Sequence, residues 1–338
     1  MSVRVGINGF GRIGRLTLRT ILARHAGAIS VTAINDLTDS RTNAHLFKWD
    51  STYGPFAGDV SASETGLTVN GRSISVFAER DPAAIPWATA EVDVVIEATG
   101  FFTDATKAAA HLGHGVKKVV ISAPAKKEDL TIVLGVNQQD YNPAVHHVIS
   151  NASCTTNGLA PIAKILNDSF GIEKGLLTTV HSYTNSQKLQ DTAAKDDLRD
   201  ARAGAENIVP SATGAARAVG LVLPELQGKF SGMAFRVPTA TVSVVDFTAL
   251  LSRAATIEEV NAAVRAAAAG PMRGIVEYTE LPLVSSDMKG NSHSSIYSAI
   301  DTIAVGGDLV KVVSWYDNEW GYACRVGDLV KFLGDQGL

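Results

Sequence analysis

Short apolar runs separated by helical spacing dominate the first half of the chain. The runs lie at residues 3–7, 30–34, 92–98, 118–122 and 145–150. Apolar runs of about 4–8 residues that alternate with helical stretches are typical of parallel strands buried on both faces. Between residues 59 and 76 apolar and polar positions alternate instead, which predicts an inserted antiparallel hairpin. The first half is therefore expected to form an open α/β sheet.

Longer strand-like runs mark the second half, at residues 177–184, 241–250 and 309–315. Helical spacing is found at residues 154–167, 257–269 and 318–333. Pro161 removes one backbone hydrogen bond inside the first of these helices, and Gly270-Pro271 ends the second. This half is expected to be an α+β domain with a mixed or largely antiparallel sheet and helices on one face. Because 338 residues are long for a single core, we expect two domains, at residues 1–150 and 151–317.

A glycine pattern lies between the first predicted strand and the first predicted helix. Gly9, Gly11 and Gly14 form G-x-G-x-x-G in the order strand, glycines, helix. Gly9 would allow a tight turn, Gly11 the close approach of a pyrophosphate, and Gly14 close packing of helix on strand. The second predicted strand ends at Asp36, where a carboxylate can accept hydrogen bonds from ribose hydroxyls. These residues predict a Rossmann-type domain that binds a dinucleotide.

Two further predicted strands end in small or hydroxylated residues. Thr99 and Gly100 follow the strand at 92–98, and Ser122 ends the strand at 118–122. Open α/β sheets bind their ligands at the carboxyl ends of the strands. We therefore expect these residues to border the same dinucleotide site.

Cys154 is one of two cysteines, and it lies where a strand-like run gives way to a helix. Unpaired N–H groups and the positive end of the helix dipole favour a thiolate there, so the pKa of Cys154 is expected below its usual value of about 8.5. A buried cysteine acting as a small hydrophobe is the alternative. The polar, hydroxyl-rich neighbours of Cys154 favour a nucleophile. The other cysteine, Cys324, is expected to be structural because it lies on the terminal helix.

A nucleophilic thiol needs a base, and His181 is the candidate. It lies near the end of a strand-like run and is flanked by hydroxyl residues, although sequence alone does not show that it contacts the thiol. Arg236 lies between apolar neighbours and needs an anionic partner, either a structural carboxylate or a substrate phosphate. Thr213 and Gly214 precede an alanine-rich helix, where an anion site is expected. The polar segment 184–207 is interpreted as a solvated loop.

Composition narrows the class of protein. Hydrophobic residues make up 46% and charged residues 19% of the chain, and the formal net charge of -4 gives no indication of a nucleic-acid partner. No apolar stretch reaches the roughly 18–20 residues that span a bilayer. The chain begins with a strand pattern rather than a signal peptide, and its two cysteines do not suggest a disulfide framework. A cytoplasmic protein without a metal site or a membrane partner is expected.

Four segments together resemble phosphorylating glyceraldehyde-3-phosphate dehydrogenases over essentially the whole chain. The segments are Ile7-Asn8-Gly9-Phe10-Gly11-Arg12-Ile13-Gly14-Arg15, Ser150-Asn151-Ala152-Ser153-Cys154-Thr155-Thr156-Asn157, His181-Ser182-Tyr183-Thr184 and Trp315-Tyr316-Asp317-Asn318-Glu319-Trp320-Gly321-Tyr322. The cysteine segment is far more specific than the glycine pattern. The resemblance implies a homotetramer, and it implies that the C-terminal helix at 318–338 packs back on the nucleotide domain.

The resemblance also implies a role for individual residues. Cys154 would be the nucleophile, and His181 the base that activates it and later handles the hydroxyl proton. Ser153, Thr155, Thr213 and Gly214 would contact the attacking inorganic phosphate, while Thr184 and Arg236 would hold the phosphate of the aldehyde substrate. The cofactor would be bound by Arg12, Ile13, Asp36, Arg80, Ser122 and Asn318, with Asn318 on the nicotinamide amide. The product of such a site would be an acyl phosphate, formed through a thiohemiacetal and a thioester.

The choice of coenzyme is left open by these residues. NAD-specific members usually carry Leu-Pro where this chain reads Asp191-Thr192-Ala193-Ala194, and the stretch Ser40-Arg41-Thr42-Asn43 resembles photosynthetic members that use NADP. Asp36 would repel a 2′-phosphate, whereas Arg41 would neutralise one. NAD is favoured, and use of both coenzymes stays open. Ser186 stands where bacterial members frequently have an aspartate, and Gly158 where a cysteine is common; the second change removes a spare thiol without touching the mechanism.

Three other functions stay open beside this one. Erythrose-4-phosphate dehydrogenase resembles this family but hydrolyses its thioester, and Tyr183-Thr184 favours the three-carbon enzyme. A semialdehyde dehydrogenase is disfavoured because Thr184 and Arg236 suit a phosphorylated substrate. A non-catalytic nucleotide- or RNA-binding protein would not need Cys154 and His181, and the mild negative charge disfavours RNA.

Overall fold

The computed structural model describes residues 2–194 and 197–338. The chain divides into two compact units, and each is described separately. The N-terminal unit holds the chain up to Ile132 together with Gln139–Ala152 and Ala323–Leu338, and the C-terminal unit holds Val133–Gln138 and Ser153–Tyr322. Of the described residues, no helix is long and apolar enough to cross a membrane.

The N-terminal unit is built on a nine-stranded sheet in the order β3-β4-β5-β2-β1-β6-β7-β9-β8. From β5 to β8 neighbouring strands are parallel, and β3, β4 and β5 form the antiparallel insertion expected from the alternation at residues 59–76. The strands are β1 (Val3–Asn8), β2 (Ile29–Asn35), β3 (Val60–Ala62), β4 (Gly66–Val69), β5 (Arg72–Phe77), β6 (Val94–Glu97), β7 (Lys118–Ile121), β8 (Leu130–Thr131) and β9 (Val148–Ser150). The central strands β6 and β7 are buried at every residue, as their apolar runs predict.

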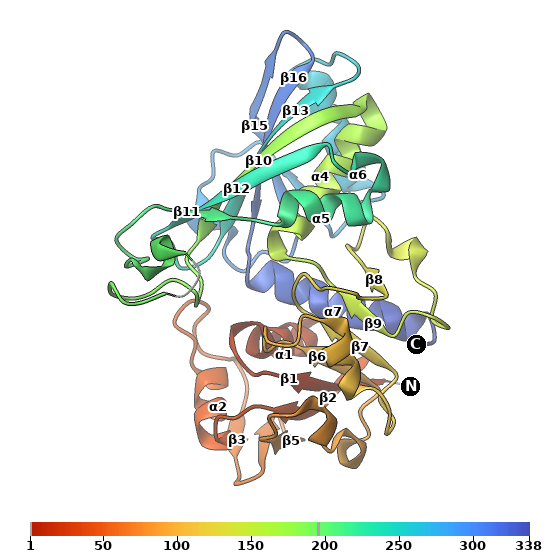
Figure 1. The fold of residues 1–338 in the computed structure, drawn as a ribbon, viewed down its shortest axis with the longest axis vertical. Coiled ribbons are helices and arrows are strands. Elements are labelled where there is room, and N and C mark those ends of the chain that lie inside the picture. Colours follow the sequence, from red (N-terminus) through yellow and green to blue (C-terminus); the bar gives the residue numbers. More distant parts are fainter. Residues whose placement is uncertain (1, 195–196) are drawn as a thin grey trace. The chain divides into compact units, whose positions relative to one another are not determined.

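Four helices belong to this unit: α1 (Arg12–Arg24), α2 (Ser40–Lys48), α3 (Ala105–Ala108) and most of α7 (Trp320–Asp335). Figure 1 labels α1, α2 and α7 beside the strands of the sheet. Helix α2 was not predicted, because its largely polar sequence hides the apolar face; Asp39 caps it by accepting a hydrogen bond from the Thr42 N–H.

The terminal helix α7 returns to the first helix of this unit. The Thr20 hydroxyl donates to the Ala323 carbonyl at 3.2 Å, and Nε2 of His25 lies 2.5 Å from the Asp328 carboxylate. Arg325 is buried and pairs with the same carboxylate. Chain ends that are distant in sequence therefore share one core.

The C-terminal unit is built on a seven-stranded mixed sheet in the order β11-β12-β10-β13-β16-β15-β14. Its strands are β10 (Ile172–Ser182), β11 (Val209–Ala212), β12 (Phe230–Val237), β13 (Ser243–Leu251), β14 (Val276–Thr279), β15 (Ser295–Val305) and β16 (Leu309–Tyr316). The pairs β10–β12 and β14–β15 are parallel and the other neighbours antiparallel. The expected fold class, a Rossmann-type domain with an α+β domain, is confirmed.

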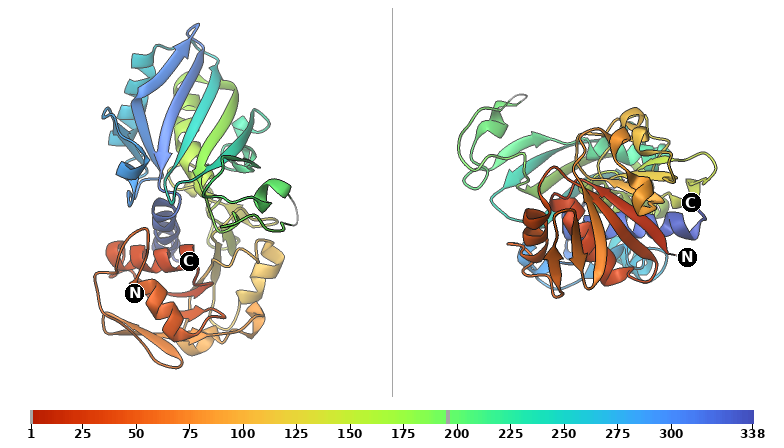
Figure 2. Two further views of the ribbon diagram at one scale, coloured as in Figure 1. Left: turned by 90° about the vertical axis from the view of Figure 1, so that its left-hand side faces the viewer. Right: turned by 90° about the horizontal axis from the view of Figure 1, so that it is seen from below.

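Helices α4 (Cys154–Phe170), α5 (Ala215–Val222) and α6 (Ile257–Ala269) cover one face of this sheet. Figure 1 shows all three on the same side of the strands, and the left view of Figure 2 shows the sheet from its other side. Along β13 the buried positions alternate, and Val245, Phe247 and Ala249 are almost fully buried. The opposite face, here called the open face, is covered by no α-helix of the described residues, and the short 3-10 helix Ser285–Met288 packs on its edge against Ile296 and Trp315. The helix α4 continues past Pro161 to Phe170, three residues further than predicted.

Candidate active site

The candidate nucleophile Cys154 is the first residue of α4. The preceding Ala152 has φ of 54°, an uncommon value for a residue with a side chain, and so bends the chain sharply between β9 and the helix. Ser153 is the N-cap, and its hydroxyl accepts a hydrogen bond from the Thr156 N–H at 2.9 Å. This cap fixes the first turn, where helical N–H groups lack intrahelical partners. The thiol therefore lies at the positive end of a long helix.

The imidazole of His181 meets this thiol. His181 lies near the end of β10, and its Nε2 is 3.5 Å from Sγ of Cys154. Its other nitrogen, Nδ1, is 2.8 Å from the Ser182 carbonyl. A carbonyl only accepts, so in the tautomer that bonds to Ser182 the proton lies on Nδ1 and the lone pair of Nε2 is directed at the thiol. That tautomer can take the thiol proton, whereas the guanidinium of Arg236, which only donates, opposes it at Nδ1.

Arg236 is the third member of the group. It lies on β12, where it is the direct register partner of His181 on the neighbouring strand β10. Its Nη1 is 2.5 Å from Nδ1 of His181, and its buried Nε has no hydrogen-bond partner. Among residues 2–194 and 197–338 no carboxylate forms an ion pair with Arg236. Of the two expected partners, an anionic ligand is therefore favoured over a structural carboxylate.

Burial decides the charge state of this group. It raises the pKa of the Cys154 thiol, and the nearby Arg236 charge and the hydrogen bonds from Thr155 only partly oppose it. The expectation of a lowered thiol pKa is therefore wrong, because desolvation by burial outweighs the effects that lower the pKa. Burial, and then Arg236, lowers the pKa of His181 to about 3. At neutral pH the site holds a neutral thiol beside a neutral base.

Tyr316, which sequence analysis did not single out, contacts residues next to the thiol and the imidazole. Its hydroxyl is 2.8 Å from the hydroxyl of Thr155, next to Cys154, and 2.8 Å from that of Thr179 on β10. Its ring meets the His181 ring edge-on with 5.9 Å between centroids. The only sequence signal was its place in the last of the four resembling segments. Tyr316 thus ties the start of α4 to the strand that carries the base.

Two of the residues expected to bind phosphate, Thr184 and Thr213, follow the ends of strands β10 and β11 of the same sheet. Thr184 follows β10, and its hydroxyl is 3.1 Å from Oε1 of Gln187 and 3.0 Å from the Ser186 hydroxyl. The Thr213 hydroxyl accepts from the Ala215 N–H at the start of α5, where Gly214 is the N-cap. Strand β11 leads to this turn and pairs with β12 beside Arg236. The structure thus places the start of α5 close to the strand of the unpaired guanidinium.

Asn318 is held by two serines. Its Oδ1 accepts hydrogen bonds from the hydroxyls of Ser182, at 2.8 Å, and Ser243, at 3.0 Å. Both lone pairs of this oxygen are thereby occupied, which fixes the orientation of the amide and directs its NH2 group away from the serines. Neither serine was singled out from the sequence as a supporting residue.

The glycine pattern of the N-terminal unit has the predicted geometry. Gly9 has φ of 90°, which an L side chain rarely adopts, and a Cβ there would lie 2.8 Å from the Thr99 nitrogen. A Cβ on Gly14 would lie 2.1 Å from the Gly9 carbonyl oxygen, so helix α1 needs glycine to pack on this turn. A Cβ on Gly11 would meet nothing within 4 Å, which leaves room for a ligand. These features fit a pyrophosphate at the start of α1.

A cavity of about 580 Å³ opens beside this turn, at the carboxyl ends of the strands. Five residues predicted to bind the cofactor line it: Gly9, Gly11, Asp36, Arg80 and Thr99. Asn8, Asn35, Leu37, Glu79, Ala98, Phe101 and Phe102 complete the wall and were not predicted. The Asp36 carboxylate accepts from the backbone N–H groups of Phe10, at 2.7 Å, and Thr38, at 2.9 Å. Its position is therefore fixed before any ligand binds.

The other predicted cofactor residues do not line this cavity. Gly14 serves helix packing, Gly100 has φ of 75°, and Ser122 donates through both its N–H and its hydroxyl to the Glu97 carbonyl. The guanidinium of Arg12 pairs with Asp50 at 2.5 Å. With its guanidinium engaged by Asp50, Arg12 offers its backbone N–H in the first turn of α1, as does Ile13.

Comparison with known proteins adds to this geometry. The family model "Glyceraldehyde 3-phosphate dehydrogenase, NAD binding domain" matches residues 3–105, and "Glyceraldehyde 3-phosphate dehydrogenase, C-terminal domain" matches residues 153–318. A glyceraldehyde-3-phosphate dehydrogenase of Geobacillus stearothermophilus is 57% identical over 338 residues, covering 100% of both chains. The chain belongs to the glyceraldehyde-3-phosphate dehydrogenase family. Glyceraldehyde-3-phosphate dehydrogenase 1 of Bacillus subtilis is 55% identical over 100% of both chains, and glyceraldehyde-3-phosphate dehydrogenase 2 of Trichormus variabilis is 54% identical over 99% of both.

As a glyceraldehyde-3-phosphate dehydrogenase family member, the chain carries its candidate residues in the segments that the two models match. The glycine turn and the cavity beside it lie in the segment matched by the NAD-binding model. Cys154, His181, Arg236 and Asn318 lie in the segment matched by the C-terminal model. Ser122 lies between the two matched segments.

Proposed function

We propose that this protein oxidises D-glyceraldehyde 3-phosphate to 1,3-bisphosphoglycerate, with NAD as hydride acceptor and inorganic phosphate as second substrate. The observation that carries the proposal is the 3.5 Å contact between Sγ of Cys154 and Nε2 of His181, beside the unpaired guanidinium of Arg236. A thiol, a neutral base and an unpaired cation are what an aldehyde with a phosphate group requires. The N-terminal unit, with α7, would bind the cofactor, and the C-terminal unit would perform the chemistry.

The first step uses the neutral thiol and the neutral imidazole. Nε2 of His181 takes the thiol proton as Sγ of Cys154 adds to the aldehyde carbon, and it then gives this proton to the aldehyde oxygen, which becomes the hydroxyl of a thiohemiacetal. NAD held by the glycine turn and Asn318 would supply the acceptor for the hydride that leaves this carbon. His181 takes the hydroxyl proton in the same step, so the carbon is left as a thioester of Cys154. An imidazole whose pKa burial has lowered stays unprotonated and ready at neutral pH.

The second step releases the product. A phosphate oxygen attacks the thioester carbon, the C–S bond breaks, and the sulfur leaves as a thiolate that the helix terminus of α4 stabilises. Ser153, Thr155, Thr213 and Gly214 would contact the attacking phosphate. Thr184 and Arg236 would hold the phosphate already on the substrate. An anion beside Arg236 would also draw the guanidinium away from Nδ1 of His181, which leaves Nδ1 bonded to the Ser182 carbonyl.

The cofactor would bind over the glycine turn, with Asp36 at the adenosine ribose, Arg80 in the same cavity and Asn318 on the nicotinamide amide. Asp36 and Leu37 line the cavity, whereas Arg41 is absent from its lining. A 2′-phosphate would therefore meet the Asp36 carboxylate without a compensating cation on α2. This favours NAD, and use of NADP as well is the alternative that kinetics must decide.

We further propose that copies of the chain associate through the open face, as a homotetramer. Leu176 on β10 is 65% exposed, and apolar residues continue across the neighbouring strands of this face: Val180, Met233, Phe235, Val244, Ile303, Val305, Leu309 and Val313. The segment 184–207, interpreted above as a solvated loop, also exposes Leu189 and Leu198. So many exposed or partly exposed apolar side chains on one sheet face, beside the single ion pair Asp246–Lys311 of its described residues, favour a partner over water. Met233→Lys should lower the assembly state in analytical ultracentrifugation.

The chemistry also favours the cytoplasm. Both cysteines are free, and the mechanism needs Cys154 reduced.

An assay of the purified protein with glyceraldehyde 3-phosphate, NAD and phosphate tests the proposed function directly. Cys154→Ser should abolish NADH formation, and wild-type turnover should require phosphate. Full activity of the serine variant would refute the nucleophile, and phosphate-independent turnover that prefers erythrose 4-phosphate would indicate the rival enzyme.

A further inference from the structure

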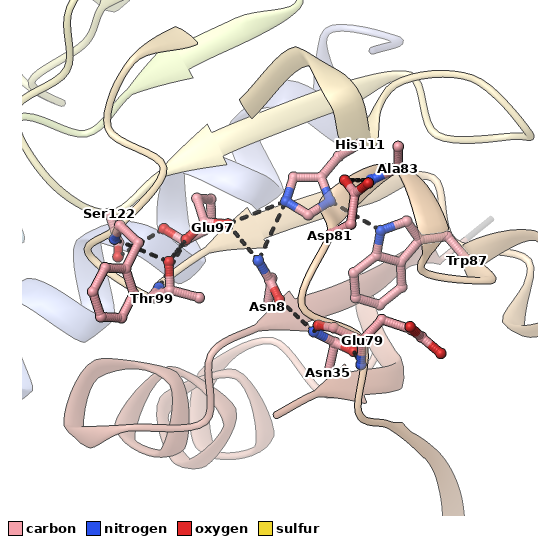
Figure 3. Close-up of polar contacts among 11 residues, drawn as sticks. Asn8, Asn35, Glu79, Asp81, Ala83, Trp87, Glu97, Thr99, His111 and Ser122 are labelled. Carbon is pink, nitrogen blue, oxygen red and sulfur yellow. Dashed lines mark hydrogen bonds and ion pairs between the residues drawn. The ribbon is translucent and has the colours of Figure 1, made fainter. Parts of the chain in front are cut away.

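A buried polar network lies behind the cofactor cavity, centred on Glu97 at the end of β6 (Figure 3). One carboxylate oxygen, Oε2, accepts from Nδ2 of Asn8 at 2.6 Å and from Nε2 of His111 at 3.1 Å. The other, Oε1, accepts from the N–H of Thr99 at 2.8 Å and from its hydroxyl at 2.5 Å. The carboxylate of Glu97 is 1% exposed and the imidazole of His111 is fully buried. All four donors point at Glu97, which suits an ionised carboxylate that only accepts.

The direction of each hydrogen bond in this network is fixed. The indole N–H of Trp87 only donates, and it reaches Nδ1 of His111 at 3.1 Å. The proton of His111 must therefore lie on Nε2, which donates to Glu97. Nδ2 of Asn8 lies 3.4 Å from the same Nε2, but both atoms are donors and share Oε2 as acceptor. Glu97 thus sets the orientation of the Asn8 amide.

The same direction continues to the wall of the cavity. Oδ1 of Asn8 accepts from Nδ2 of Asn35 at 2.8 Å. Asn35 then binds the backbone of Glu79 twice at 2.8 Å, donating to its carbonyl and accepting from its N–H. Glu79 precedes Arg80, and both line the cavity with Asn8, Asn35 and Thr99. The backbone N–H of Glu79 can only donate and its carbonyl can only accept. The hydrogen bonds that run from Glu97 through Asn8 and Asn35 to Glu79, here called the relay, therefore have one allowed direction.

We propose that Glu97 is a positioning residue for the cofactor: through Asn8 and Asn35 it sets the polarity of the hydrogen bonds that hold the Glu79–Arg80 segment, and through Thr99 it holds the opposite wall. The proposal rests on the cavity being the adenosine half of the NAD site. Glu97 itself does not line the cavity, so its action on a ligand is indirect.

Glu97→Gln tests this at nearly constant shape. If the new NH2 group replaces Oε2, it faces the donors of Asn8 and His111, so the Asn8 amide must turn over. Asn35 must then turn as well. Its reversed amide would place NH2 against the Glu79 N–H and oxygen against the Glu79 carbonyl, and the backbone cannot exchange these groups to restore the hydrogen bonds. We expect the Kd for NAD, and for AMP as a probe of the adenosine half, to rise about tenfold, as for loss of one buried charged hydrogen bond. The KM for NAD should rise with it, while kcat and the KM for glyceraldehyde 3-phosphate change less than about twofold.

The network also predicts its own rescue. In the double variant Glu97→Gln with Asn8→Asp, the amide of residue 97 donates to the new carboxylate, which still accepts from Nδ2 of Asn35. Nε2 of His111, 3.4 Å from the Asn8 nitrogen, can donate to the same carboxylate. Donor and acceptor are exchanged between the two positions and the buried charge is kept. Affinity for NAD should return to within about threefold of wild type.

Glu277→Gln is the matched control. Glu277 also accepts from an asparagine and a histidine, Asn291 and His293, but in the C-terminal unit. It should leave the Kd for NAD unchanged. A Glu97→Gln protein with a lower melting temperature and wild-type Kd, or a double variant no better than the single one, would overturn the proposal. If Glu97→Gln does not fold, Asn35→Leu cuts the relay at its other end, and unchanged NAD binding there would also overturn it. Wild-type protein that binds NAD without oxidising glyceraldehyde 3-phosphate would refute the proposed function alone.

Discussion

Arg236 and His181 face each other across two parallel strands, with Nη1 of the guanidinium 2.5 Å from Nδ1 of the imidazole. They are register partners on β12 and β10, although 55 residues separate them in the chain. The arginine charge lowers the pKa of His181 and also opposes the effect of burial on the pKa of Cys154. One unpaired cation therefore acts on both the base and the nucleophile.

Removing this charge should change both substrate binding and thiol reactivity. In Arg236→Gln the pKa of Cys154 should rise, because burial then acts without the opposing charge. The pH midpoint of iodoacetamide alkylation should move upward, and alkylation at pH 7 should slow. The KM for glyceraldehyde 3-phosphate should rise about 10- to 100-fold from the loss of a charge-assisted phosphate contact. Arg253→Gln, at an exposed arginine of the same unit, should change neither quantity.

The lowered pKa of His181 also predicts how stability depends on pH. An unfolded histidine is protonated below about pH 6.5, whereas folded His181 resists protonation down to about pH 3. The unfolded state therefore binds one more proton between these values, and the fold loses stability as pH falls through this window. His181→Gln removes this term.

Urea unfolding at pH 7 and pH 5, at one protein concentration, measures the effect. The free energy of unfolding of wild type should fall by about 2 kcal/mol more than that of His181→Gln between the two pH values. Equal losses in both proteins would show that His181 is not held neutral by the fold. His114→Gln, at an exposed histidine, serves as the control.

The parts of this protein that sequence analysis predicted are those with local signals. The α6 boundaries match the predicted 257–269: Gly270-Pro271 marks the end in the sequence, and the structure shows a capping box at Thr256 at the start. The glycine turn and its geometry were also predicted from a local signal, the three glycines between a strand and a helix. The support for the site was missed because it depends on distant pairs: Tyr316 meets Thr155 across 161 residues, and Asn8 meets Glu97 across 89. The direction of the Cys154 pKa was wrong because burial is a property of the fold.

Asp36 should control the choice of coenzyme. Its carboxylate is fixed by two backbone N–H groups and lines the cavity where the adenosine ribose would lie. Asp36→Ala should raise the ratio of kcat/KM for NADP to that for NAD about tenfold or more, because the repulsion of a 2′-phosphate and the ribose contacts are lost together. Initial rates with both coenzymes measure this. Asp39→Ala removes an equal charge three residues away at the cap of α2 and should leave the ratio unchanged.

Tyr316→Phe should lower stability. The ring would stay packed against His181, but the hydroxyls of Thr155 and Thr179 would lose their shared buried partner. We expect the free energy of unfolding to fall by about 1–3 kcal/mol. The double variant Tyr316→Phe with Thr179→Val should lose less free energy of unfolding than the sum of the two single variants. Such a result would show that the hydroxyls of Tyr316 and Thr179 act as one unit. Additive losses would contradict this coupling.

Ser243→Ala should weaken the hold on Asn318. The hydroxyl of Ser243 donates to Oδ1 of Asn318 and accepts from the Ser182 N–H at 3.1 Å, so it orients the amide and supports the strand that carries the base. Without it one lone pair of Oδ1 is free, and the amide can turn its NH2 group inward. The KM for NAD should rise several-fold, while the Kd for AMP, which lacks the nicotinamide, stays at the wild-type value. Ser243→Thr keeps the hydroxyl and should retain most of the affinity. An equal loss of AMP and NAD binding would mean that Ser243 supports the fold rather than the orientation of Asn318.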